Sequence, residues 1–284
     1  MIVRSLDNRH AAQIYNLLLQ DVDANLFLLD ILMRRGLRGW GSERWSGVFD
    51  GNKLLSIAVS FGRKSKGSRS RLFVGVGDPS ACELLGKQEQ LAGGTRLIIG
   101  DRSASDGLYA GMGKPPYRIF YDQRLYVCTQ TVAGASLPLR YGTMEHFEQI
   151  YNHSAEMMKE DLQIDPREND DVFHRAAIQH RLTNQKTLVG FHQRKICFLL
   201  DIGTYFNLGS QVGGTFVPAE FRRRGFASSG MRGSCLLLFK QCKKVTLHVH
   251  EKNTSAIKLY EKVGFQPRTP FRLISFVPVQ QHVQ

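Results

Sequence analysis

Apolar and polar positions alternate in short runs along the second half of the chain, and these runs are separated by stretches with helical periodicity. Strands are expected over residues 137–140, 187–191, 195–205, 212–217, 245–250 and 271–277. Helices are expected over residues 145–161 and 171–182, then from the turn near residue 225 to residue 243, and finally up to residue 263. This order predicts an α/β (α+β) protein with a mixed, mostly antiparallel sheet flanked by helices.

The pattern of the first strand and helix occurs twice. Residues 3–16 align with residues 139–152 at a constant offset of 136 (140 minus 4). Six residues of the first copy recur identically in the second: Arg4, His10, Gln13, Ile14, Tyr15 and Asn16. Two weaker matches follow, between 49–53 and 191–195 and between Leu108-Tyr109 and Leu259-Tyr260. The chain is therefore predicted to contain two similar domains, residues 1–130 and 131–284, joined by the small residues at 131–136.

One junction in the second domain has the layout of an anion site. Pro218 ends the predicted strand because it cannot donate to a ladder, and a helix follows after a turn. Gly225 and Ala227 are small enough for the first N–H groups of that helix to approach a ligand. Arg222, Arg223 and Arg224 add positive charge beside the helix dipole. The arginines alone fit a pyrophosphate site and a solvated turn equally well.

A second junction follows the strand at 245–250. Asn253 is expected to cap the next helix at its start, and Gly264 to cap its end. Tyr260 comes seven residues after Asn253, close to two helical turns, so the two side chains are expected on nearly the same side.

Together these junctions resemble a known family. Arg222-x-x-Gly225-x-Ala227 resembles the acyl-coenzyme A signature of the GNAT acyltransferase superfamily. Asn253-x-x-Ala256-x-x-Leu259-Tyr260, followed by Gly264-Phe265, resembles its second motif. The resemblance covers about residues 135–276, and two motifs in the expected order are more specific than one.

The resemblance implies a GNAT-like fold, present twice, and an acetyl-CoA-dependent N-acetyltransferase. The acceptor would be a primary amine of a small molecule, an amino acid or a peptide. Phe216 and Val217 would hold the pantetheine arm through the backbone, and Asn253 would contact the pantetheine or the diphosphate. Tyr260 would protonate the departing thiolate as general acid, or else simply pack on the core. The pyrophosphate would be held by Arg222, Arg223, Arg224, Gly225, Phe226 and Ala227.

No motif identifies a general base. Asp201 and Glu160 are the first candidates for this role, and Glu156, Asp161 and His248 are further candidates. Asp201 stands inside an apolar strand, where a carboxylate requires a stabilising partner or a functional role. A hydrogen bond to the backbone and recognition of the acceptor explain it equally well.

The first domain is expected to be degenerate. Where its phosphate cradle should lie, residues 73–80 contain glycines but no arginine, and Asp78 would repel an anion. Its expected uses are to support the second domain, to cover the acceptor pocket or to form a homodimer contact.

Composition adds limits rather than a function. In 284 residues there are five scattered cysteines, no metal-ligand spacing, no apolar run of membrane-spanning length and no signal-peptide core, so a cytoplasmic protein without metal or membrane partner is expected. The net charge of +13 lies in separate groups without an aromatic platform, which argues against nucleic acid. The rival functions are a non-catalytic acyl-CoA sensor and, less favoured, a basic nucleic-acid-binding protein.

Overall fold

The computed structural model describes residues 1–37, 43–61, 71–92, 95–169 and 171–276. They form two compact units. The N-terminal unit contains residues 1–125, 250–252 and 268–276, and the C-terminal unit contains residues 126–249 and 253–267. The predicted division at residue 130 stays a prediction.

The N-terminal unit has a sheet with the strand order β1-β2-β3-β4-β5-β12. Strands β4 and β5 are parallel, and the other recorded pairs are antiparallel. Its strands are β1 (Ile2–Ser5), β2 (Glu43–Asp50), β3 (Lys53–Phe61), β4 (Arg71–Gly77), β5 (Thr95–Asp101) and β12 (Gln266–Phe276). Its helices are α1 (Ala11–Leu18), α2 (Val22–Arg35), α3 (Pro79–Ala92) and α4 (Arg102–Gly111). Strand β6 (Tyr117–Cys128) leads from this unit into the next.

The C-terminal unit has strands in the order β11-β10-β9-β8-β7, with β10 and β11 parallel and the rest antiparallel. These strands are β7 (Leu139–Tyr141), β8 (Thr187–His192), β9 (Lys195–Phe206), β10 (Gly209–Phe216) and β11 (Val245–His250). The helices are α5 (Phe147–Leu162), α6 (Pro166–Asn169), α7 (Asp171–Thr183), α8 (Phe226–Leu238) and α9 (Thr254–Val263). The predicted fold class, a mostly antiparallel mixed sheet with flanking helices, is confirmed.

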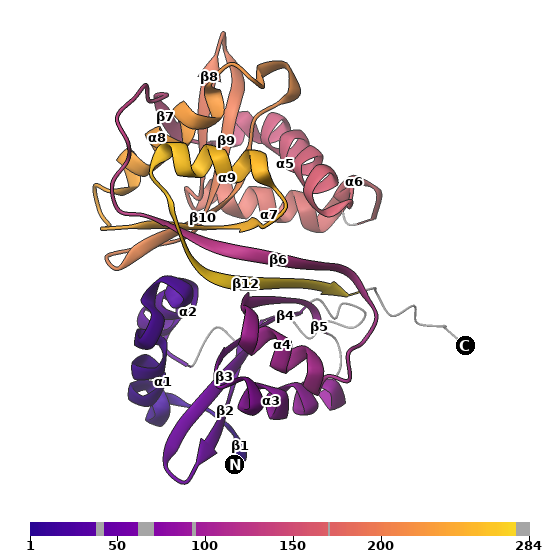
Figure 1. The fold of residues 1–284 in the computed structure, drawn as a ribbon. Helices are drawn as coiled ribbons and strands as arrows, with labels where there is room; N and C mark the ends of the chain where they lie inside the picture. Colours follow the sequence, from indigo (N-terminus) through magenta and orange to yellow (C-terminus); the bar gives the residue numbers. More distant parts are fainter. Residues whose placement is uncertain (38–42, 62–70, 93–94, 170, 277–284) are drawn as a thin grey trace. The chain divides into compact units, whose positions relative to one another are not determined.

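Helices cover both faces of the C-terminal sheet (Figure 1). Leu188, Phe198 and Leu200 pack with α8 and α9, whereas their neighbours Val189 and Leu199 pack with α5 and α7. This alternation follows from the two-residue period of a strand, which turns successive side chains to opposite faces. It also explains the long apolar run of β9, which is buried on both sides.

The last strand differs from expectation. Residues 271–277 were predicted to complete the second sheet, but β12 pairs antiparallel with β5, with Phe271 opposite Asp101 and Ser275 opposite Leu97. The N-terminal unit therefore takes its final strand from the C-terminal end of the described chain. The apolar pattern predicts a strand but carries no information about which sheet edge accepts it.

The internal repeat has a structural basis. In each copy the strand leads into a short 3₁₀ turn whose histidine, His10 or His146, accepts a hydrogen bond at Nδ1 from the backbone N–H of Asp7 or Thr143. These two capping boxes satisfy helix N–H groups that lack partners within the helix. The recurrence of the histidine is thereby explained without a catalytic role.

Among the helices of the described residues, none combines the length and the apolar character needed to cross a membrane. All five cysteines are buried and free of disulfides.

Candidate functional site

Strands β10 and β11 separate within the C-terminal sheet. Their recorded pairing joins Ser210 to Val245 and Gln211 to Thr246 and does not continue beyond these residues. Gly214 has a φ of +57°, and the register of β10 against β9 shifts between Gly213 and Phe216. A bulge of this kind turns the strand away from its ladder. Backbone groups at the end of β10 are therefore available to a ligand.

The turn after β10, where the sequence predicts a phosphate cradle, leads directly into α8. Arg223 and Gly225 adopt positive φ values of 58° and 85°, and α8 begins directly afterwards at Phe226. Gly225 caps the helix without a side-chain hydrogen bond. A Cβ placed on Gly225 would meet no atom within 4 Å, so the space over the helix start is open. The first N–H groups of α8 have no partner inside the helix and point into this space.

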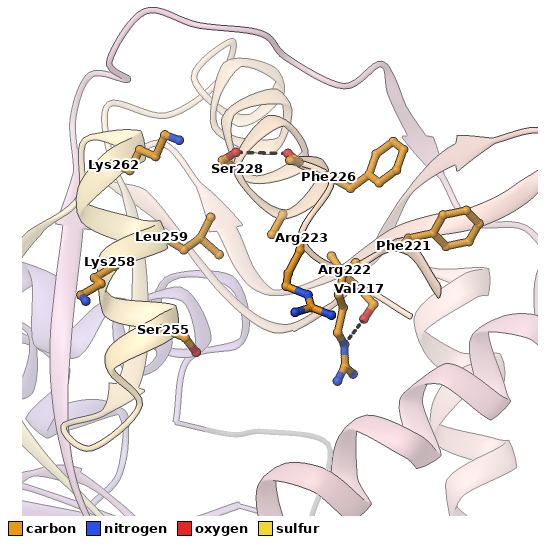
Figure 2. A pocket seen from close by; sticks show the side chains of 12 residues that line it. Val217, Phe221, Arg222, Arg223, Phe226, Ser228, Ser255, Lys258, Leu259 and Lys262 are labelled. Carbon is orange, nitrogen blue, oxygen red and sulfur yellow. Dashed lines mark hydrogen bonds between the residues drawn. The ribbon is translucent and has the colours of Figure 1, made fainter. Parts of the chain in front are cut away.

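A pocket of about 310 Å³ lies between this turn and α9 (Figure 2). It is lined by Val217, Phe221, Arg222, Arg223, Gly225, Phe226, Ala227, Ser228, Ser255, Lys258, Leu259 and Lys262. Most of the predicted cofactor-binding residues of the turn are thus brought together in one place. A helix start that faces cations across a pocket favours a polyanionic ligand.

Sequence reasoning missed Lys258 and Lys262. They stand four residues apart on α9, and Figure 2 shows them across the pocket from the arginine turn. The spacing places both on one side of the helix. Only their four-residue spacing on either side of Tyr260 could have indicated them in the sequence. Lysines on any exposed helix face have the same spacing.

The three arginines occupy different environments. Arg222 donates through Nε to the carbonyl of Val217 at 2.9 Å and lies over the ring of Phe216, whose own side chain is buried. Arg223 lines the pocket, whereas Arg224 is not among the lining residues. The guanidinium of Arg224 lies over the ring of Phe226 at 5.5 Å. Arg223 is therefore the arginine best placed to meet an anion directly.

Asn253 is where the sequence placed it, at the start of α9. Its side-chain oxygen accepts hydrogen bonds from the Ala256 N–H at 3.1 Å and the Ser255 hydroxyl at 3.0 Å. Gly264 ends the helix at a φ of +118°. Both predicted caps are confirmed. Asn253 is not among the residues that line the pocket, and its oxygen is engaged in capping.

Tyr260 connects the core to the open end of β10. Its ring packs against Phe265, with centroids 5.8 Å apart, and its hydroxyl has a hydrogen bond with Thr215. Burial, with a smaller contribution from the charge of Asp161, raises the pKa of Tyr260 to about 12, although the hydrogen bond with Thr215 acts in the opposite direction. The phenol is therefore protonated at neutral pH and able to donate a proton.

Two adjacent acids at the end of α5 differ in their partners. Glu160 is exposed, and its two oxygens lie 2.8 and 2.9 Å from one terminal nitrogen of Arg222. Asp161 lies close enough to Tyr260 to affect its titration. The Asp161 side chain is exposed to solvent, but desolvation by the surrounding protein, followed by the charge of Glu160, raises its pKa, and Arg222 opposes this shift. A raised pKa makes a carboxylate a better proton acceptor near neutral pH.

Asp201 is buried behind the bulge of β10. It accepts a hydrogen bond from the Thr187 hydroxyl at 2.6 Å and pairs with Arg181 Nε at 3.4 Å. A Cβ on Gly214 would lie 2.8 Å from one carboxylate oxygen of Asp201, so the glycine allows this close approach. Burial raises the pKa of Asp201. Its carboxylate therefore has partners from β8 and α7, beside the strand that diverges.

The other candidate bases lie apart from the turn. Glu156 is 3.6 Å from the Nδ1 of His153. Burial lowers the pKa of His248 on β11 to about 4, so its imidazole is neutral at pH 7. No group of three or more His, Cys, Asp or Glu side chains able to hold a metal is found within the described ranges.

The corresponding turn of the N-terminal unit has a different structure. Asp78 precedes α3, and its carboxylate accepts hydrogen bonds from the Ala81 N–H at 3.0 Å and the Ser80 hydroxyl at 2.6 Å. These bonds, chiefly the one from the Ser80 hydroxyl, lower the pKa of Asp78 below its usual value, and desolvation opposes them only in part. The chain's own carboxylate therefore occupies the position that an anion would take at α8.

Glycines also close the gap between α3 and α4. A Cβ at Gly86 would lie 2.2 Å from the Leu108 carbonyl oxygen, and one at Gly111 would lie 1.9 Å from that of Glu83. A Cβ at Gly107 would lie 2.3 Å from the Pro79 carbonyl oxygen. The two helices thus meet backbone to backbone. The helix pair of the N-terminal unit leaves no room for a ligand of the size that fits between α8 and α9.

Comparison with known proteins agrees with this geometry. A family model described as FR47-like protein matches residues 202–272, which run from β9 to β12 and include the turn and α9. No curated protein matches the chain.

Solved structures match nearly the whole chain. The GCN5-related N-acetyltransferase from Sphaerobacter thermophilus has a TM-score of 0.60 at 16% identity, over 96% of this chain and 94% of its own. A GNAT-family acetyltransferase from Colwellia psychrerythraea has a TM-score of 0.56 at 11% identity, over 98% and 100%. A tandem GNAT protein from the clavulanic acid biosynthesis pathway has a TM-score of 0.54 at 11% identity, over 98% and 99%. These likenesses extend over nearly the whole chain and show that it has the GNAT fold, as the resemblance implied.

Proposed function

We propose that the C-terminal unit is an acetyl-CoA-dependent N-acyltransferase that acylates a primary amine of a small molecule, an amino acid or a peptide. The observation that carries the proposal is the open start of α8, which faces cations across a pocket and adjoins a strand with free backbone groups. Fold likeness and the FR47-like match support acyl transfer in general.

Acetyl-CoA would be held at two places, its charged diphosphate and its pantetheine arm. The diphosphate would accept hydrogen bonds from the first N–H groups of α8, with Arg223, Lys258 and Lys262 neutralising its charge. The pantetheine amides would pair with the backbone of β10 between Gly213 and Phe216, where pairing with β11 has ended. This arrangement directs the thioester toward the hydroxyl of Tyr260 at Thr215.

The reaction needs one proton acceptor and one proton donor. The neutral amine attacks the thioester carbonyl, a C–N bond forms, and the C–S bond breaks. Tyr260 donates its phenolic proton to the leaving thiolate, and Asp161 accepts the proton that the amine loses. Solvent then returns a proton to Tyr260. The raised pKa makes Asp161 a stronger base, and it keeps Tyr260 protonated until the thiolate leaves.

Arg222 and Glu160 are both predicted site residues, but their side chains form an ion pair with each other. Their ion pair is exposed, so it contributes little to stability. A bound diphosphate would compete with Glu160 for Arg222. In this proposal Glu160 neutralises the turn when the donor is absent, and Asp161 takes the role of base that was assigned to Glu160. Asp201 would orient the acceptor through the bulge of β10.

The test is thiol release from acetyl-CoA with a panel of amines, run beside calorimetric titration of acetyl-CoA. The proposal predicts saturable binding and thiol release with at least one class of amine. Binding without release for every amine would favour the sensor function. Absence of binding would contradict both functions, and a shift on heparin that persists at saturating coenzyme A would favour nucleic acid.

A further inference from the structure

A second depression, of about 500 Å³, lies on the C-terminal unit and shares no lining residue with the pocket at α8. We name it the basic basin. Its polar lining comes from Arg140 on β7, His146 and Gln149 at the start of α5, and Arg194 in the turn between β8 and β9. Its apolar lining is Pro138, Leu139 and Phe191.

The Arg140 guanidinium is fixed in place. It lies over the ring of Phe191 with 4.2 Å between its central carbon and the ring centroid. A guanidinium held by one face on an aromatic ring keeps its N–H groups directed outward from its edge. This geometry suits a carboxylate or a phosphate, which accepts two parallel hydrogen bonds.

Two hydrogen-bond donors meet in the basin. His146 Nδ1 accepts the Thr143 N–H at 3.1 Å, so a neutral ring carries its proton on Nε2. That Nε2 lies 3.3 Å from a terminal nitrogen of Arg140, which also carries hydrogens. With the imidazole proton on Nε2, neither group accepts a hydrogen bond from the other. An acceptor placed between them would satisfy both, and an oxyanion supplies such acceptors.

The basin contains positive charge without an acid to balance it. Within the described ranges, its lining includes neither Asp nor Glu. Arg194 adopts a φ of +66° at the hairpin turn, and Gln149 adds a carboxamide donor. Guanidinium groups that line a concave surface without carboxylate partners raise the local concentration of anions.

The N-terminal copy of the same motif is balanced internally. Arg4 lies 5.1 Å from the Phe49 ring, and His10 packs on that ring at 5.7 Å. There, however, the Asp7 carboxylate lies 3.1 Å from His10 Nδ1 and is bound by Arg9, whose terminal nitrogen donates to it at 2.7 Å. Gln13 donates to the Asn52 carbonyl oxygen at 3.0 Å.

The repeat replaces these partners in the second copy. Thr143 stands where the first copy has Asp7 (143 minus 7 is 136), and Arg194 matches Asn52 in the hairpin turns. The aspartate beside the histidine is lost and an arginine is gained in the hairpin turn, while the arginine, the phenylalanine and the histidine stay. Glu145 stands where the first copy has Arg9 (145 minus 9 is 136), but Glu145 is not among the residues that line the basin.

We propose that the basic basin is a binding site for an oxyanion, either a carboxylate or a phosphate, separate from the donor pocket. The anion lies between the edge of Arg140 and His146 Nε2, with Arg194 and Gln149 closing around it. The site is within reach of the donor turn, because His192, the residue after Phe191, packs on Phe226 with ring centroids 5.2 Å apart.

Titration of the full chain with inorganic phosphate and with succinate tests the proposal, with sodium chloride added to hold ionic strength constant. The signals of the His146 ring in nuclear magnetic resonance spectra provide the readout. The proposal predicts a saturable shift with at least one anion, and the tighter of the two identifies the ligand as phosphate or carboxylate. A shift with neither anion, or one reproduced by chloride alone, would overturn it.

Two variants separate the basin from other anion sites. Arg194→Gln should weaken binding about tenfold, because one charge-assisted hydrogen bond is lost. Thr143→Asp should abolish the saturable shift by supplying the carboxylate of the N-terminal copy while both arginines stay. Arg4→Gln, in the matched N-terminal position, and Arg223→Gln, in the donor turn, should leave the shift unchanged. Equal binding in wild type, Arg194→Gln and Thr143→Asp would contradict the assignment.

Discussion

Helices α3 and α8 follow the fourth strand of their respective units, but they begin in opposite ways. At α3, the Asp78 carboxylate accepts the Ala81 N–H. At α8, Gly225 provides no side chain, and the space over it is open. A helix start binds an anion only when its N–H groups are free. If α8 binds the donor as proposed, the comparison explains how one fold supports a ligand site in one copy and excludes it in the other.

The helices that come next reinforce the difference. α4 meets α3 through glycines, including Gly86 and Gly111, whereas α9 leaves a pocket of about 310 Å³ and places Lys258 and Lys262 on it. Two separate changes thus close the N-terminal unit, one electrostatic and one steric. Reversal of either alone should not restore a site there.

The largest expected effect is on turnover. Tyr260→Phe should lower turnover about 100-fold or more, because removal of a general acid has an effect of this size, and it should leave acetyl-CoA affinity nearly unchanged. Steady-state thiol release and calorimetry measure the two quantities. Tyr109→Phe is the matched control, since Tyr109 takes the same place in the repeat and its hydroxyl bonds the Pro115 carbonyl. Equal turnover in both variants would remove Tyr260 from the mechanism.

The next prediction concerns a substitution that makes the start of α8 resemble the start of α3. Gly225→Asp places a carboxylate at the open helix start, so acetyl-CoA affinity should fall on the order of 30-fold through repulsion and occupation of the N–H groups. Gly225→Asn is the control, because Asn tolerates the same positive φ without charge. If both variants bind alike, charge at this position is not what distinguishes the units.

The steric part of the comparison is tested through stability. Gly111→Ala forces a methyl group to 1.9 Å from the Glu83 carbonyl oxygen and should lower the free energy of unfolding. Overpacking of this kind costs about 2 kcal/mol. Denaturant unfolding measures it, with Gly213→Ala as the control, because a Cβ there meets nothing within 4 Å. Equal stability of the two variants would mean that α3 and α4 are not in close contact.

The smallest effect concerns the lysines of α9. Lys262→Gln should weaken acetyl-CoA binding about fivefold at low salt and less at high salt, as expected for one partly screened phosphate contact. Calorimetry at two salt concentrations measures this. Lys240→Gln, beyond the far end of α8, should have no effect. An identical loss for both lysines would indicate a general charge effect rather than a pocket contact.

Local chemistry made part of this structure predictable. Glycine at positions 225 and 264 and a capping Asn253 are dictated by backbone geometry, so the sequence places the turn and α9 correctly. Asp78 was expected to repel an anion, and it caps α3 itself. These features depend on residues close together in the chain.

Features that depend on distant partners were not predictable. Glu160 and Arg222 are 62 residues apart, and nothing local shows that they pair. Strand β12 has the pattern of a strand, but its partner β5 lies more than 150 residues earlier. Lys262 resembles any exposed helix lysine until α9 is placed beside α8. Such pairings follow from the tertiary fold, which a residue pattern does not encode directly.

The number of acetyl-CoA molecules bound per chain tests the central claim most directly. Calorimetric titration of the full chain should give one site per chain, and Gly225→Asp should weaken that site on the order of 30-fold. Two sites would show that the N-terminal unit also binds the donor. No binding at all would contradict the assignment of the α8 turn as a diphosphate site.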